Sequence, residues 1–113
     1  MKNIFILCFV VFTVACTTQK PLYVWQNYDT SSYNYLKDAN EASVQQLINT
    51  YENLINNEKG ARGVLPPGVY ADYGFILLQL NQTEKGKMML QQEVALYPES
   101  KVFIERVLKL FEE

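Results

Sequence analysis

Residues 69–80, VYADYGFILLQL, predict a buried helix around which the other elements pack, because apolar side chains occupy nearly every side of a helix built from them. A helix without a polar face is buried on more than one side. Pro66 and Pro67 lie just before this stretch and predict the start of the helix, since the first turn needs no backbone N–H partner. We therefore expect a central helix over residues 69–80, entered from a loop over residues 60–68.

The preceding stretch, residues 38–59, predicts a helix with only one buried face. Its apolar residues recur at the spacing of a single helical stripe, and polar residues fill the other side. The stripe consists of Val44, Leu47, Ile48, Tyr51, Leu54 and Ile55. Asp38 and Glu41 have the spacing of a capping box, and Gly60 is a natural stop.

Two more helices are expected after the central one. Thr83 is a suitable N-cap for the first of them, and Pro98 ends it. The last carries its apolar residues at helical spacing: Phe103, Ile104, Val107, Leu108 and Phe111. Gly74 and Gly86 each cost about 1 kcal/mol relative to alanine inside a helix. We expect the two glycines to mark a close approach between their helices.

The chain shows no alternating strand pattern, so the predicted class is all-α, with about four to five helices in a small tetratricopeptide-like array. Seven positions fall close to the tetratricopeptide spacing: Tyr70, Tyr73, Gly74, Leu77, Gly86, Leu90 and Pro98. Glu93 departs from that pattern, since it occupies a position where alanine is usual. One repeat does not bury its own face, so the helices on either side must cover it.

An aromatic segment comes before these helices. Residues 23–35 hold the only tryptophan and half of the tyrosines: Tyr23, Trp25, Tyr28, Tyr33 and Tyr35. Asp29, Thr30 and Ser31 are candidates to cap a short helix that carries Tyr33 and Leu36 inward. The rings either cover the first layer of a small core or form a binding surface for a partner or a sugar.

The N-terminus has the features of a targeting segment. Lys2 precedes an apolar run from Ile4 to Phe12 that is shorter than the roughly 20 residues a membrane span needs. Val14-Ala15-Cys16 resembles a bacterial lipobox, with Thr13 where leucine is usual. We expect residues 1–15 to be a lipoprotein signal peptide, 16–22 a lipidated tether, and 23–113 the helical domain. The alternative is ordinary signal-peptidase cleavage after Ala15, which leaves a free thiol.

Lipid on Cys16 predicts attachment to the cell envelope. A bacterial lipoprotein carries two or three acyl chains, such as palmitate, and two or more chains anchor a protein stably. Thr17 follows the cysteine in place of the aspartate that retains many lipoproteins in the inner membrane. The expected location is the outer membrane, facing the periplasm. Since Cys8 falls within the signal peptide, no intrachain disulfide is expected in the mature protein.

Composition argues against several classes of function. The formal net charge of −2 provides no electrostatic footprint for nucleic acid. Histidine is absent, which removes the commonest general base and metal ligand. Ser100 and Lys101 are neighbours that point to different helix faces, and the carboxylates are scattered. We expect no enzyme activity, no cofactor and no metal.

The segments PPGVYADYG and EVALYPESKVF, with the aromatic YVWQNYDTSSYNYLKD after a lipobox, resemble the small bacterial lipoproteins of domain-of-unknown-function family 4810. The resemblance extends over essentially the whole mature chain. It departs at Asn81, where glycine is usual in the turn between helices, and at Gly86, where alanine is usual. It implies a lipid-anchored periplasmic protein, often encoded near a CsgG-like outer-membrane lipoprotein, and no established activity.

Two functions follow as expectations. The first is a non-catalytic adaptor or subunit of an envelope complex whose partners are the membrane, through its lipid, and other envelope proteins or lipoproteins. The second is a module that binds peptidoglycan or a small ligand through the aromatic segment. The candidate interaction residues are Trp25, Tyr28, Tyr33, Tyr35, Pro66, Pro67, Pro98 and Glu99, and the candidate lipidation site is Cys16.

Overall fold

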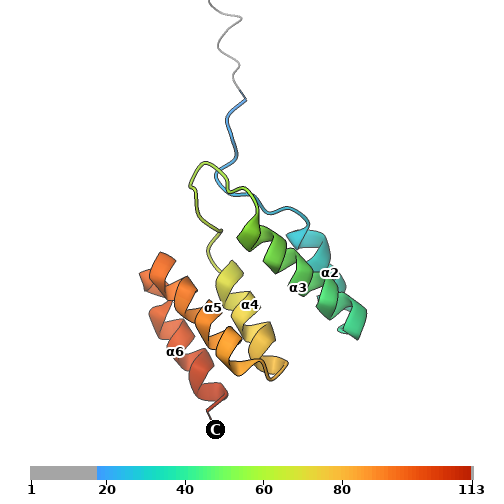
Figure 1. The fold of residues 1–113 in the computed structure, drawn as a ribbon, viewed down its shortest axis with the longest axis vertical. Helices are drawn as coiled ribbons and strands as arrows, with labels where there is room; N and C mark the ends of the chain where they lie inside the picture. Colours follow the sequence, from blue (N-terminus) through green and yellow to red (C-terminus); the bar gives the residue numbers. More distant parts are fainter. Residues whose placement is uncertain (1–17, 113) are drawn as a thin grey trace, which may run out of the picture.

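The computed structural model describes residues 18–112, which form five α-helices and one 3-10 turn without any strand. In chain order the elements are α2 (Tyr28–Lys37), α3 (Glu41–Asn56), α4 (Val69–Gln79), α5 (Thr83–Leu96), η1 (Pro98–Ser100) and α6 (Lys101–Leu110). The helices form an array that follows the order of the chain (Figure 1). The predicted all-α class is confirmed. Cys16 and the predicted signal peptide, 1–15, lie outside the described residues.

Helix α4 is the central element, as predicted, because it contributes to both parts of the core. Tyr73 and Leu77 pack in a cluster with buried residues of α3. Ala71 and Leu78 pack in a second cluster with Leu90 of α5 and with buried residues of α6. Opposite sides of α4 therefore serve different neighbours, which explains why its sequence has almost no polar face.

The contact between α4 and α5 depends on Gly74 and Gly86. A Cβ atom on Gly74 would lie 2.9 Å from the carbonyl oxygen of Gly86, and a Cβ on Gly86 would lie 2.9 Å from the carbonyl oxygen of Gly74. Each position is therefore closed to a larger residue unless the helices separate. The predicted close approach of these two helices is confirmed.

The start of α4 differs from the prediction. Pro66 and Pro67 lie in the turn before the helix rather than in its first turn, and Gly68 is the N-cap with a φ of 92°. The cap comes from another helix: Glu93 of α5 accepts hydrogen bonds from the N–H groups of Gly68 (2.8 Å) and Ala71 (3.4 Å). Glu93 is only 2% exposed. This capping role explains why glutamate occupies a position where alanine is usual in the tetratricopeptide pattern.

The predicted capping box of α3 is wrong. Asn40 is the N-cap, and its side chain accepts a hydrogen bond from the N–H of Ser43 at 2.9 Å. The Ser43 hydroxyl donates in turn to the carbonyl oxygen of Asp38, which fixes the chain just before the helix. The helix ends at Asn56, earlier than Gly60 suggested, and the Lys59 ammonium donates to carbonyl oxygens of its last turn.

Helix α2 begins at Tyr28, before the predicted cap at residues 29–31. The inward-facing residue is Ser31, whose hydroxyl shares a hydrogen bond of 2.7 Å with Thr50 of α3. Tyr33 and Leu36, expected inside, are 63% and 81% exposed. A small serine lets α2 lie close to α3, and this register turns Tyr33 and Leu36 away from the core, while Tyr28 and Tyr35 pack against it.

The N-cap of α5 is also displaced by one residue. It is Gln82 rather than Thr83, and its side chain makes no capping hydrogen bond. A difference of one residue at a helix end is common.

The segment before α2 is attached to the loop between α3 and α4. The N–H groups of Ala61 and Arg62 donate to the carbonyl oxygens of Pro21 (2.8 Å) and Leu22 (3.1 Å). Gly60 allows this contact, because a Cβ there would collide with the same two carbonyl groups. Within residues 18–112, no helix is both long enough and apolar enough to cross a membrane.

Candidate functional site

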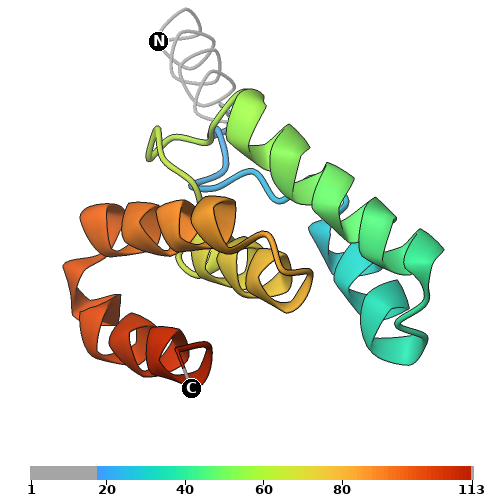
Figure 2. The same cartoon turned by 60° about the horizontal axis from the view of Figure 1, so that its bottom comes forward.

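Two adjoining cavities follow one face of α4 and share Asp72 and Phe75 in their walls. The first, of about 220 Å³, lies among α2, α3 and α4. The second, of about 320 Å³, lies between α4 and α6. Helices α2 and α6 lie on either side of α4 (Figure 2). We call the continuous surface formed by the walls of these two cavities the α4 groove.

The α4 groove exposes apolar side chains that a folded chain normally covers. Leu36 from α2 and Leu110 from α6 are 81% and 71% exposed, more than any other large apolar residue that the structure describes. Phe103 of α6 is 60% exposed and lines the same groove. Contiguous exposed apolar surface is typical of interaction sites, whereas single exposed side chains are ordinary.

Asp72 is the only charged residue in the walls of the α4 groove. It lies in the first turn of α4, where a carboxylate is stabilised by the helix dipole. The Tyr28 hydroxyl donates to its Oδ2 atom at 2.7 Å. Burial raises the pKa of Tyr28 to about 12, and the Asp72 carboxylate contributes to the increase. Tyr28 therefore remains a donor to Asp72 throughout the neutral pH range.

The aromatic segment is divided between the core and the surface. Tyr28 and Tyr35 line the α4 groove and pack on the cluster that holds Tyr51. Trp25 is 44% exposed, with its ring 5.4 Å from that of Tyr28. Tyr33 points away from the groove and is exposed. Two predicted tyrosines thus lie on the α2 side of the groove, but none of the predicted site residues lies on its α6 side.

The predicted proline sites lie outside the α4 groove. Pro66 is buried, while Pro67, Pro98 and Glu99 are exposed. The loop before α4 and the turn after α5 are joined by the Tyr97 hydroxyl, which donates to the carbonyl oxygen of Leu65 at 2.5 Å. Burial raises the pKa of Tyr97 to about 12. This hydrogen bond connects the two segments that carry the predicted residues.

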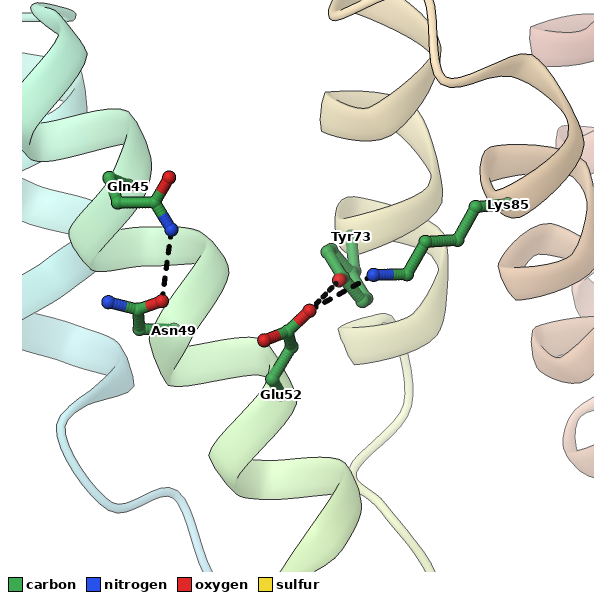
Figure 3. A network of polar contacts seen from close by, with 5 residues as sticks. All are labelled: Gln45, Asn49, Glu52, Tyr73 and Lys85. Atoms are coloured by element: carbon green, nitrogen blue, oxygen red, sulfur yellow. Dashed lines mark hydrogen bonds and ion pairs between the residues drawn. The ribbon is translucent and has the colours of Figure 1, made fainter.

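A polar network joins three helices at a different place (Figure 3). Glu52 of α3 accepts hydrogen bonds at one oxygen from the Tyr73 hydroxyl (2.8 Å) and the Lys85 ammonium (3.0 Å). Lys85 also lies 5.3 Å from the centre of the Tyr73 ring. Lys85 and then Tyr73 lower the pKa of Glu52, while burial raises the pKa of Tyr73. The shifts keep Glu52 ionised and Tyr73 protonated, a stable pair rather than an acid and base ready for proton transfer.

The structure contains no arrangement of metal ligands in its described part. Among residues 18–112, no group of three or more aspartates, glutamates or cysteines is close enough to hold an ion. The chemistry available at the α4 groove is therefore apolar contact with one carboxylate and a few hydroxyl groups.

Most of the groove was not predicted as a site from the sequence, including Leu36, Asp72, Phe75, Phe103 and Leu110. Asp72 interrupts an otherwise apolar helix, and this was the only signal that could have drawn attention to it. Phe103 belongs to the apolar pattern that predicts the buried face of the last helix, and Leu110 lies outside that pattern, so the pattern identified neither of them as a site residue.

Comparison with known proteins identifies the family of this chain. Searches of the curated proteins and of the solved structures gave no match. The family described as "Domain of unknown function (DUF4810)" matches residues 22–107, which include all five helices up to the last turn of α6. Since this match covers most of the chain, the protein belongs to the DUF4810 family.

Proposed function

We propose that the protein is a non-catalytic adaptor, anchored by lipid on Cys16 to the periplasmic side of the outer membrane. The observation that carries this proposal is the α4 groove, an exposed apolar surface formed mainly by α2, α4 and α6. The groove suits a protein partner, because apolar anchors in a concave surface supply most of the affinity of such contacts. We also propose that the helices form a tetratricopeptide-like repeat and that the partner is a CsgG-like lipoprotein.

The sequence supports the membrane part of the proposal. The apolar run from Ile4 to Phe12 is followed by Val14-Ala15-Cys16, and the family match begins at residue 22. Mass spectrometry of membrane-extracted protein should detect an acylated N-terminal Cys16. A soluble periplasmic form with an unmodified thiol would contradict this part, and the Cys16→Ser variant should lose membrane attachment.

The adaptor part is tested by co-purification from solubilised envelopes. Leu36→Gln combined with Phe103→Gln removes two exposed apolar contacts from the α4 groove and should reduce recovery of the partner by about tenfold or more. Val102→Gln is a matched control, since Val102 is also 60% exposed on α6 but does not line the groove. Equal recovery from the groove variant and the control would refute the adaptor function of the groove.

A second candidate is a binding module for peptidoglycan or a small ligand. The observation that favours it is the half-exposed Trp25 ring beside Tyr28, because such rings stack on sugars. In this case the purified protein should sediment with isolated sacculi, and Trp25→Ala should abolish sedimentation. The adaptor function predicts no dependence of sedimentation on Trp25.

A further inference from the structure

We propose that the α4 groove binds an amphipathic helix of a partner protein, and that this helix carries a lysine or arginine that pairs with Asp72. The inference depends on the proposed adaptor function and specifies the chemistry of the partner. It follows from the few hydrogen-bonding groups in the groove, from its single charge and from the lack of a cation in a contact between two copies of the groove.

The groove offers almost nothing to the backbone of an extended peptide. Its walls come mainly from α2, α4 and α6, whose backbone groups are bonded within the helices, and residues 18–112 contain no strand with a free edge. The polar side chains in the walls are few: Tyr28, Ser32, Tyr35, Tyr51 and Asp72. An extended segment would lose its hydration without replacing it, at a cost for each unpaired group. A helix satisfies its own backbone and presents only side chains.

The walls also have the form that receives a helix. Leu36 lies on the α2 side of the groove, and Phe103 and Leu110 lie on the α6 side. Phe75 of α4 lines both cavities and lies between these two sides. Phe103 and Leu110 are seven residues apart, so they occupy one face of α6. Apolar side chains at positions i, i+3, i+4 and i+7 of a partner helix can contact both sides together.

Asp72 determines the charge of that helix. No lysine or arginine among the described residues lies within 4 Å of its carboxylate, whose one hydrogen-bond donor from a side chain is Tyr28. An apolar helix seated in the groove would remove water from this carboxylate. A carboxylate that loses its water without gaining a cation is strongly destabilised, so a partner without a cation there would bind poorly. A lysine or arginine directed at Asp72 removes this penalty.

A second copy of this chain that docks through the same groove does not meet the requirement. Two molecules that meet through the same groove form an isologous contact, in which each surface faces its own equivalent. The groove carries one negative charge and no positive charge, so such a contact supplies no cation to either Asp72. A different protein is therefore the better occupant.

The test is photo-crosslinking of the full-length protein in its own membrane. A benzophenone amino acid is placed at Phe103, and at Val102 as the control that lies outside the groove. Mass spectrometry then identifies the crosslinked peptide. We expect residue 103 to capture a segment of another protein with apolar residues at helical spacing and a lysine or arginine among them. A peptide from this chain, an acidic or uncharged segment, or no crosslinked protein would overturn the inference.

Charge variants complete the test. Asp72→Lys should reduce the crosslink from residue 103 by about tenfold or more, whereas Asp72→Glu should retain most of it. Circular dichroism establishes that each variant is folded, and Asp72→Asn replaces Asp72→Lys if the latter is not. An unchanged crosslink in the folded variant overturns the inference. If the groove variants reduce co-purification but the charge variants do not change the crosslink, the adaptor function is retained and the proposed partner helix with a cation is wrong. If neither the groove variants nor the charge variants have an effect, the adaptor function is wrong as well.

Discussion

Glu93 is the residue whose chemistry departs most from what its position in the sequence suggests. It lies on α5, is almost completely buried, and accepts hydrogen bonds from the first N–H groups of α4. A carboxylate is stabilised at a helix N-terminus by these donors and by the helix dipole. The cap of α4 is therefore also a link between the two helices that form the centre of the molecule.

Removing this cap should destabilise the protein measurably. Glu93→Ala leaves buried N–H groups without an acceptor, so we expect a loss of about 1–3 kcal/mol in the free energy of unfolding. Glu93→Gln keeps an acceptor oxygen and should lose less. Urea denaturation followed by circular dichroism measures both, with Gln91→Ala on the exposed side of α5 as the control. If Glu93→Ala unfolds at the same urea concentration as the control, the cap contributes nothing.

Tyr28 should make the stability of the fold sensitive to alkaline pH. Its folded-state pKa is raised to about 12, above the ordinary value of 10.0 in the unfolded chain. Below pH 10 both states are protonated, so its stabilising contribution is fully present. Between about pH 10 and pH 12 only the unfolded state loses the proton, and stability falls as pH rises. In urea titrations over this range, Tyr28→Phe should lose stability less steeply than the natural protein. Parallel curves would show that Tyr28 is not responsible.

The packing of α4 on α5 depends on two glycines that face each other. A Cβ on Gly74 would meet Leu90 Cγ at 2.8 Å and the Gly86 carbonyl oxygen at 2.9 Å. Leu90 is completely buried, so neither it nor the backbone has free space to move into. Alanine improves helix propensity by about 1 kcal/mol, but overpacking costs about 1–3 kcal/mol.

We therefore expect Gly74→Ala and Gly86→Ala to destabilise the protein, by up to about 2 kcal/mol each, despite the gain in propensity. The double variant should cost less than the sum, because the first substitution already separates the helices. Thermal unfolding measures the effect, with Gln92→Ala on the exposed side of α5 as the control. A higher melting temperature for either glycine variant would mean that the helices are not in close contact there.

The helices could be predicted largely from sequence, but their ends and their exposed faces could not. The apolar stretch 69–80 and the glycines identified α4 and its partner, because periodicity and glycine placement are local signals. Asp38 and Asn40 have the same capping chemistry two residues apart, so the sequence did not choose between them. Glu93 caps a helix that begins 24 residues earlier, and no local pattern indicates such a contact.

The candidate site was predictable only in part for a related reason. Tyr28 and Tyr35 were identified by the crowding of aromatic residues, and both line the α4 groove. Phe103 and Leu110 belong to the last helix, which has more apolar residues than α4 and α5 can cover. Which of them are buried depends on the angle at which α6 leaves η1, and this is a property of the tertiary structure.

At the scale of the whole molecule, the segment that leads into the helical domain is bonded to one end of that domain. Residues 18–22 pass beside the loop between α3 and α4, and the C-terminal end of α6 lies at the other end of the molecule (Figure 1). Two backbone hydrogen bonds and the Lys20–Glu58 ion pair hold the segment there. The five residue steps from Cys16 to Pro21 span at most about 18 Å. If Cys16 carries lipid, the loop end of the domain must therefore stay close to the bilayer.

This geometry predicts the orientation of the anchored protein. A fluorophore at Ala61→Cys, an exposed position in the loop, should be quenched more strongly by spin-labelled lipid headgroups than one at Glu112→Cys. The lipidated protein is reconstituted in phosphatidylethanolamine–phosphatidylglycerol vesicles for the measurement. A long Gly-Ser insertion between Gln19 and Lys20 should lower quenching at residue 61 to the level at residue 112, because a flexible linker extends the reach of the tether. Equal quenching at both positions without the insertion would show that the domain rotates freely about its anchor.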